Sequence, residues 1–177
     1  VLAELVEPDF SIITNINASH LEGLGDLDGV FREKIDLFEA TKKTGTIFIN
    51  MDDPMLKQVA DKPMRRAYTY GMQRHAAFML SVEKDKGLEG LDIALSLRGE
   101  VVRTTTRLLG THKLYNILAA AAIASAVGVS QETIATKVAT FEPYPGRFKV
   151  FTAKKGYTLI DDSYNANPAS MEWAIAT

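Results

Sequence analysis

The fold is decided by residues 11–70, a stretch that opens with Ser11-Ile12-Ile13-Thr14-Asn15-Ile16. This opening run is apolar and rich in β-branched residues, which is typical of a buried strand. A helix, a strand, a short helix and a second strand are then expected near residues 27–41, 45–50, 53–60 and 66–70. Strands and helices that alternate in this way predict an α/β fold with a mostly parallel, doubly wound sheet flanked by helices.

The pattern changes after residue 70. Three strand-like runs with short connections predict a small antiparallel meander near residues 77–84, 91–98 and 100–108. Two helices are expected next, near residues 112–127 and 130–141. Ser130 is a good N-cap residue for the second of them.

A cluster of turn residues, Pro143-Tyr144-Pro145-Gly146, interrupts this second pattern. We therefore predict a domain boundary here, with a central domain over 1–142. Residues 143–177 are expected to form a linker and the beginning of a second α/β domain. Within that part, Tyr157-Thr158-Leu159-Ile160 has the apolar character of a buried strand.

The composition excludes several classes of protein. The chain has 177 residues, of which 46% are apolar, so it has enough core material to fold. A net charge of -2 gives no electrostatic reason to expect a nucleic acid partner. The absence of cysteine excludes disulfides and thiolate catalysis, and the longest apolar run, 117–127, is too short to cross a bilayer. We expect a cytoplasmic protein, a monomer, with no membrane insertion.

The segment that says most about function is Asp161-Asp162-Ser163-Tyr164-Asn165-Ala166-Asn167-Pro168. It follows the strand expected at 157–160 and precedes a helix that Pro168 opens. Its carboxylates and amides therefore lie at the carboxyl end of a strand, where open α/β sheets bind ligands. A polar turn with a helix cap uses the same residue types, so both interpretations stay open.

Lys34 stands on the apolar stripe of the helix near 27–41, a stripe that consists of Leu27, Val30, Phe31 and Phe38. A lysine in such a place usually extends its amine to solvent. The alternative is a desolvated amine with a lowered pKa, which can add carbon dioxide and present carbamate oxygens to a magnesium ion. His20 follows the first strand at the ligand-binding end of the sheet, which makes it the second candidate for this site.

Another candidate site is Gly110-Thr111-His112-Lys113-Leu114-Tyr115-Asn116, at the start of an alanine-rich helix. His112 and Asn116 are four positions apart and share a helix face. An asparagine amide donates and accepts hydrogen bonds, as the edge of a purine base requires. Helix capping by Thr111 beside a surface asparagine is the other interpretation. Arg147, directly after the turn, is either a phosphate clamp or an ordinary surface arginine.

Taken together, these segments resemble the Mur ligase family of ATP-dependent peptide ligases, in the same order and over nearly the whole chain. The likeness to the family's metal-binding segment rests on Thr14-Asn15-Ile16, His20-Leu21-Glu22 and Lys34. Asn50-Met51-Asp52-Asp53 is similar to the family's N-x-D-D turn, and residues 110–116 are similar to its G-x-H-N-x-x-N motif. Pro145-Gly146-Arg147 resembles the segment with its linker arginine. Members that add D-alanyl-D-alanine carry D-D-[ST]-Y-N-A-N-P and H-L-E-G-F-G, which are similar to residues 161–168 and 20–25.

The resemblance implies a ligase of peptidoglycan precursor synthesis. ATP would phosphorylate the carboxylate of a UDP-linked muramoyl tripeptide, and the amine of D-Ala-D-Ala would then displace phosphate. Carbamylated Lys34 and His20 would hold Mg²⁺. The resemblance further implies that Asn116, helped by His112, binds the adenine. Asp162 would bind the ribose hydroxyls, and Arg147 would reach the phosphates. The residues expected on the substrate side are Asn15, Tyr164, Asn165 and Asn167.

The chain also departs from the family pattern. Lys113 stands where the motif has asparagine, on the adenine side. The chain contains neither G-x-x-x-x-G-K-[ST] nor G-x-G-x-x-G, so we expect the phosphate-binding loop and the first metal-binding glutamate upstream of Val1. Most of the C-terminal domain is expected beyond Thr177, and the isolated chain is then an inactive fragment. Two alternatives stay open: another family member, such as a folylpolyglutamate synthase, and a non-catalytic homologue that binds nucleotide.

Overall fold

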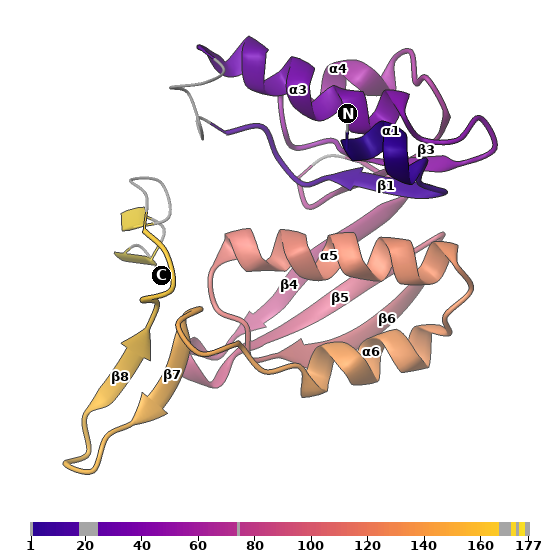
Figure 1. Ribbon diagram of the computed structural model, residues 1–177. Coiled ribbons are helices and arrows are strands. Elements are labelled where there is room, and N and C mark those ends of the chain that lie inside the picture. The colour runs from indigo at the N-terminus through magenta and orange to yellow at the C-terminus, as the bar shows by residue number, and fades with distance from the viewer. Residues whose placement is uncertain (1, 18–24, 74, 167–170, 173, 176–177) are drawn as a thin grey trace.

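The computed structural model describes residues 2–17, 25–73, 75–166, 171–172 and 174–175, and for Thr111 and His112 the backbone alone. A six-stranded sheet runs through the molecule, and its strands lie side by side in sequence order (Figure 1). They are β1 (Phe10–Ile13), β2 (Thr46–Asn50), β3 (Arg66–Gly71), β4 (Phe78–Asp85), β5 (Leu91–Leu97) and β6 (Glu100–Thr106). Neighbours from β1 to β4 are parallel, and β4, β5 and β6 are antiparallel. This mixed sheet confirms the predicted α/β class.

The change of direction begins at a short connection between β3 and β4. The two strands run parallel for two residue pairs only, Tyr70 with Phe78 and Gly71 with Met79. A parallel crossover usually takes a dozen residues or more, but here residues 72–77 suffice. The backbone N–H groups of such a tight connection need acceptors. A carboxylate of the functional site, that of Asp52, accepts from two of these N–H groups.

Helices cover both faces of the sheet (Figure 1). α3 (Leu27–Glu39) and α4 (Lys57–Ala60) share one apolar cluster with β1 and β2, and the short α1 (Leu2–Val6) lies beside α3. α5 (Thr111–Ala126) and α6 (Gln131–Thr140) share the other cluster with β3, β4 and β5. β2 is buried along its whole length because Ile47 and Ile49 face the first cluster and Phe48 faces the second.

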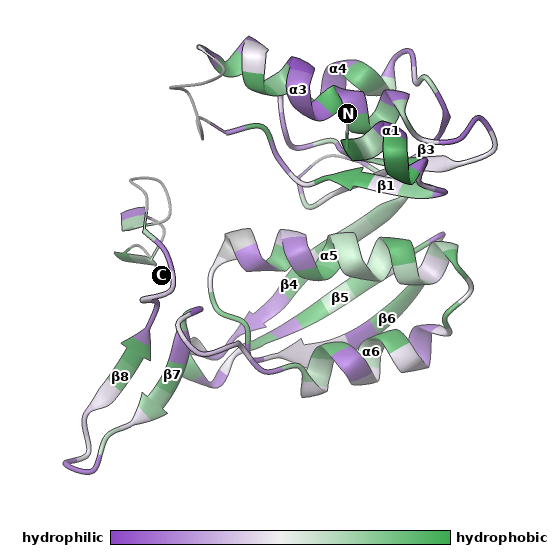
Figure 2. Cartoon of the chain, viewed as in Figure 1, coloured by the Kyte–Doolittle hydropathy of each residue, from purple (hydrophilic) through white to green (hydrophobic). Residues whose placement is uncertain are grey.

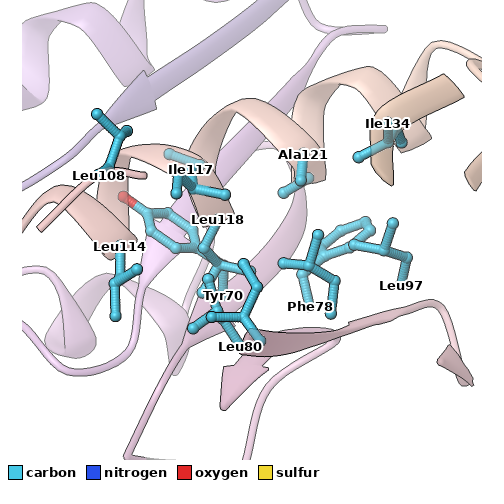
Figure 3. Packing of buried hydrophobic residues seen from close by; sticks show 14 of the residues in the cluster. Tyr70, Phe78, Leu80, Leu97, Leu108, Leu114, Ile117, Leu118, Ala121 and Ile134 are labelled. Carbon is cyan, nitrogen blue, oxygen red and sulfur yellow. The ribbon is translucent and has the colours of Figure 1, made fainter. Parts of the chain in front are cut away.

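The alanine-rich α5 packs closely against the sheet because its small side chains allow close approach. Figure 3 shows this packing, in which the sheet and its neighbours contribute Tyr70, Phe78, Leu80, Leu97 and Leu108, and the helices contribute Leu114, Ile117, Leu118, Ala121 and Ile134. The Ser130 hydroxyl accepts a hydrogen bond from the Thr133 N–H at 3.2 Å, which confirms the predicted N-cap of α6. No helix in the described part of the chain is long and apolar enough to cross a membrane.

The first strand is shorter than predicted. β1 ends at Ile13, whereas the apolar run continues to Ile16. The reason is that backbone groups of residues 14–16 bind side chains from other elements instead of a neighbouring strand. These bonds belong to the functional site described below.

The predicted burial of residues 157–160 is wrong. β7 (Lys149–Thr152) and β8 (Thr158–Asp161) pair as an antiparallel hairpin that stands apart from the six-stranded sheet (Figure 1). Apolar residues occur on both strands (Figure 2), yet Leu159 is 46% exposed and Ile160 is 47% exposed. Two strands have no second layer of their own, and no described helix covers this pair.

Candidate functional site

A turn at the carboxyl end of β2, Asn50–Asp53, holds the segment that follows β1; we call it the strand-end turn. The Asn50 amide donates to the carbonyl oxygen of Thr14 at 2.8 Å. Asp53 Oδ2 accepts from the Ile16 N–H at 2.7 Å, and its Oδ1 accepts from two backbone N–H groups further along its own chain. Both side chains are buried. The strand-end turn therefore fixes the backbone on either side of Asn15.

The amine of Lys34 lies against this fixed segment. Its Nζ donates to the carbonyl oxygen of Asn15 at 2.8 Å. Burial lowers the pKa of Lys34, and the negative charge of Asp53 offsets part of that effect. A cavity of about 510 Å³ opens beside the amine, between β1, α3 and α1. Of the two interpretations of Lys34, the structure favours the inward, partly desolvated amine.

A metal ion at this place needs ligands beyond those that the structure describes. His20 lies outside the described residues. Among the described residues, no group of three or more His, Cys, Asp or Glu side chains is placed to hold a metal ion. Lys34 as an ammonium group repels a cation, whereas its carbamate would offer oxygen ligands. The donor set therefore fits Mg²⁺ if Lys34 carries a carbamate and if His20 and a bound phosphate supply further ligands.

The strand-end turn also contacts α5. Asp52 Oδ2 accepts from the Tyr115 hydroxyl at 2.9 Å, from the Gln73 N–H at 3.0 Å, and from the Met72 N–H. The last two groups belong to the short connection between β3 and β4. Burial, together with the hydrogen bond to Asp52 and the charge of that carboxylate, raises the pKa of Tyr115 to about 12. The phenol therefore keeps its proton throughout the neutral range and donates its hydrogen bond to Asp52.

Asn116, the residue after Tyr115, is exposed on α5. It lies at the rim of an apolar cleft of about 270 Å³ between α5 and α6. The apolar walls of this cleft include Ile117, Ile134 and Phe141. The His112 side chain lies outside the described part of the structure, so its predicted partnership with Asn116 stays a prediction.

The remaining predicted residues gather where the turn Pro143-Tyr144-Pro145-Gly146, which we call the linker turn, meets the segment after β8. The Gly146 N–H donates to Asp161 Oδ2 at 3.0 Å, and the Tyr164 N–H donates to the Gly146 carbonyl at 3.0 Å. The Arg147 guanidinium carbon lies 4.0 Å from the centre of the Tyr164 ring, a cation–π contact. Two residues predicted from separate motifs are thus in direct contact.

Lys113 ties this group to the amino end of α5. Its Nζ donates to the Arg147 carbonyl at 3.0 Å and lies 4.4 Å from the centre of the buried Phe148 ring. Burial lowers the pKa of Lys113, the charge of Asp162 opposes this shift, and the charge of Arg147 adds to it. The residue that departs from the family motif therefore connects α5 to the linker turn.

Most of the predicted site residues that the structure describes form two groups, and Asn116 at the cleft between α5 and α6 belongs to neither. Lys34 and Asn15 form one, and Arg147 and Tyr164 form the other, with Asp162 near Lys113. Asn165 is exposed and accepts from the Ala166 N–H at 2.9 Å, whereas Asn167 lies outside the described residues. Figure 1 shows the carboxyl end of β1, the amino end of α5 and the segment after β8 on the same side of the molecule.

Sequence reasoning assigned no role to Asp52, Tyr115 or Lys113, although all three connect the parts of the site. The available signal was the strand-end turn itself, in which three polar side chains, Asn50, Asp52 and Asp53, come directly after the apolar run Ile47-Phe48-Ile49. Its partners could not be inferred, because the contact between Asp52 and Tyr115 joins residues 63 positions apart.

Comparisons with known proteins define the class. The family description "Mur ligase middle domain" matches residues 1–124, and the chain therefore belongs to the Mur ligase family. It is 28% identical over 175 residues to the UDP-N-acetylmuramoyl-tripeptide–D-alanyl-D-alanine ligase of Bacillus subtilis (strain 168), a match that covers 99% of this chain and 37% of that protein. The chain thus spans well under half of this relative.

Solved structures agree on the fold. A crystal structure of MurF from Acinetobacter baumannii matches with a TM-score of 0.86 at 24% identity, over 97% of this chain and 37% of that one. MurF from Thermotoga maritima, in complex with ADP, matches with a TM-score of 0.85 at 22% identity, over 99% of this chain and 40% of that one. The family resemblance inferred from the motifs is confirmed.

Proposed function

We propose that this chain is the middle region of an ATP-dependent ligase that joins D-Ala-D-Ala to a UDP-linked muramoyl tripeptide, a step of peptidoglycan precursor synthesis. The observation that carries the proposal is the partly desolvated Lys34 amine at the carboxyl end of β1. Residues 161–168 support the choice of D-Ala-D-Ala, and so does the activity for which the Bacillus relative is named. Since the reaction consumes ATP, we expect a cytoplasmic protein, and we also expect a monomer.

The proposed chemistry has two steps. The peptide carboxylate attacks the γ-phosphorus of ATP, which forms an acyl phosphate and releases ADP. The amine of D-Ala-D-Ala then attacks the acyl carbon, and a tetrahedral intermediate collapses to an amide as phosphate leaves and the amine loses a proton. The protein contributes mainly positioning and positive charge near the transferred phosphoryl group.

Lys34 has a defined task in this scheme. As a neutral amine it attacks carbon dioxide, forms an N–C bond and loses a proton, which leaves a carbamate. The lowered pKa raises the neutral fraction that this step requires. The carbamate and His20 would hold Mg²⁺, which would offset the charge on the phosphoryl oxygens.

The nucleotide and the substrates are assigned to the other predicted residues. Asn116, with His112, is proposed to meet the adenine, and its exposed amide at the rim of an apolar cleft supports that role. Arg147 is proposed to reach the phosphates and Asp162 the ribose hydroxyls. The substrate-side residues in this proposal are Asn15, Tyr164, Asn165 and Asn167.

The test uses the full-length gene product, ATP, D-Ala-D-Ala and UDP-muramoyl tripeptide, with mass spectrometry of the ligated product. We expect ATP-dependent formation of the pentapeptide product and release of one phosphate for each amide formed. Turnover with folate and glutamate instead would favour a folylpolyglutamate synthase. Nucleotide binding without turnover on any of these substrates would favour the non-catalytic homologue.

Replacement of Lys34 probes the assigned site. Lys34→Ala should lower kcat by a factor of about 10² or more, because the phosphoryl group loses its metal ligand. Added short carboxylates should restore part of the activity, since a carboxylate can occupy the place of the carbamate. Lys42→Ala is the matched control, because Lys42 forms an exposed ion pair with Asp9 and should be replaceable without loss.

A further inference from the structure

We propose that Asp52 is a positioning residue that sets the orientation of the amino end of α5, and hence of the Asn116 amide, relative to the strand ends. The inference rests on the proposed function and extends it to a residue with no assigned role. Its basis is the convergence of three donors from two elements on one carboxylate oxygen. In a nucleotide site, a small displacement of a residue that contacts the base weakens the binding of the nucleotide.

The first observation is the set of contacts around Asp52. Its Oδ2 accepts two backbone N–H groups from the connection after β3 and the hydroxyl of Tyr115 on α5. Bonds to a charged acceptor are about twice as strong as bonds between neutral groups. One carboxylate therefore joins the connection between β3 and β4 to α5, a helix that is far away in sequence.

The second observation is the confinement of this carboxylate. Oδ1 is buried and has no hydrogen-bond partner among the residues that the structure describes. The group also lies against Gly71, where an added Cβ would come within 3.1 Å of Oδ2 and 3.3 Å of Oδ1. A buried oxygen without a partner is unfavourable, and the three bonds that Oδ2 accepts offset this cost. The two N–H groups of Met72 and Gln73 orient the carboxylate, and this orientation sets the direction of the bond to Tyr115.

The third observation is the position of Asp52 within the strand-end turn. Its neighbours Asn50 and Asp53 fix the backbone on both sides of Asn15, and Asn15 accepts the bond from Lys34. The same four-residue turn thus binds the Lys34 side and the α5 side of the site. Asp52 is the member that points to α5.

Tyr115 transmits this position to Asn116. The two residues are adjacent on α5, and a helix turn is rigid, so a shift at Tyr115 moves the Asn116 amide with it. Beyond Tyr115, the interior face of α5 is apolar and is set by packing alone. The Tyr115 hydroxyl therefore adds a directional constraint on the amino end of α5, beside the bond that Lys113 donates to the Arg147 carbonyl.

The test compares four variants of the full-length gene product by steady-state kinetics. Tyr115→Phe removes the hydroxyl and keeps the ring, and we expect the KM for ATP to rise roughly ten-fold with kcat and the KM for D-Ala-D-Ala within about two-fold. Asp52→Ala should show the larger effect. Asp52→Asn should recover part of the loss, because its amide oxygen still accepts from the Tyr115 hydroxyl but carries no charge.

Tyr68→Phe is the matched control. Tyr68 lies on β3. Its hydroxyl accepts bonds from Arg66 and Arg98, on a part of the sheet away from the strand-end turn. Its KM for ATP should stay at the wild-type value. The proposal is overturned if Tyr115→Phe behaves like Tyr68→Phe, or if its loss falls on kcat with an unchanged KM for ATP, as a merely destabilised enzyme would show.

The two proposals fail in different ways. If the wild-type protein binds a fluorescent ADP analogue but ligates none of the substrates, the proposed function fails and the analogue affinities of the same variants decide the role of Asp52. If the wild type does not bind nucleotide, both proposals fall.

Discussion

The molecule contains two turns rich in Asp and Asn, each at the carboxyl end of a strand, and they are held in opposite ways. In the strand-end turn after β2, the side chains bind partners far away in sequence, and Asn50 and Asp53 are buried. In the turn after β8, Ser163 bonds locally to Asp161, the only distant partner among the described residues that bonds to this turn is Gly146, and Asp162 and Asn165 stay exposed. The comparison teaches that similar residues brace the sheet in one turn and remain available to a ligand in the other.

The largest expected effect comes from breaking the buried turn. Asp53→Ala would leave three backbone N–H groups without their acceptor, those of Ile16, Met55 and Leu56. We expect a loss of about 3 kcal/mol in the free energy of unfolding. Urea denaturation of the 177-residue chain, followed by circular dichroism, measures it.

The matching change in the exposed turn is Asp162→Ala. Because Asp162 is exposed, its removal should alter the free energy of unfolding by no more than about 0.5 kcal/mol. Equal losses for the two variants would contradict the distinction between a bracing turn and an available one.

A smaller effect is expected where the exposed turn meets the linker. Gly146 has φ +74°, and an added Cβ would lie 3.1 Å from Cβ of Tyr164. Gly146→Ala should therefore loosen this contact and speed hydrogen exchange of the Tyr164 amide about ten-fold, since that amide donates to the Gly146 carbonyl. Mass spectrometry or NMR of the exchanging chain gives the rate.

Gly99→Ala is the control that separates the steric clash with Tyr164 from the backbone strain of a positive φ. Gly99 has φ +89° with nothing within 4 Å of an added Cβ, so this variant carries the same backbone strain and no clash. It should leave exchange at Tyr164 unchanged. Faster exchange in both variants would mean that general destabilisation, and not the local contact, controls the exposed turn.

The smallest effect depends on pH. Hydrogen bonds from the Ser163 hydroxyl, the Ser163 N–H and the Gly146 N–H hold the pKa of Asp161 below its usual value. A lowered pKa in the folded state contributes stability above the unfolded value and loses it as pH falls through the folded value. The amide resonances of Ser163 and Gly146 should therefore shift in acid below the ordinary titration range of aspartate.

Asp161→Asn provides the check on this titration. An amide cannot gain a proton in this range, so the same two resonances should stay flat in the variant. A midpoint at the ordinary aspartate value in the wild type would show that these bonds do not hold the carboxylate.

The sequence predicted the sheet and helices well, because their signals are periodic and local. The apolar stripe around Lys34 placed this lysine on the inner side of α3, but its acceptor, the Asn15 carbonyl, became known only from the fold. The same applies to the early end of β1 at Ile13, which follows from bonds to Lys34, Asn50 and Asp53. Apolar composition alone misled for residues 157–160, since it cannot tell a strand inside a sheet from an exposed hairpin.

The account depends most on Lys34 carrying a carbamate that binds a metal ion, and ¹³C NMR tests this directly. The full-length gene product is equilibrated with ¹³C-bicarbonate, as wild type, Lys34→Ala and Lys42→Ala. We predict a protein-bound carbamate resonance in the wild type and in Lys42→Ala, broadened by Mn²⁺ and absent from Lys34→Ala. No such resonance in the wild type, or the same resonance in Lys34→Ala, would contradict the account.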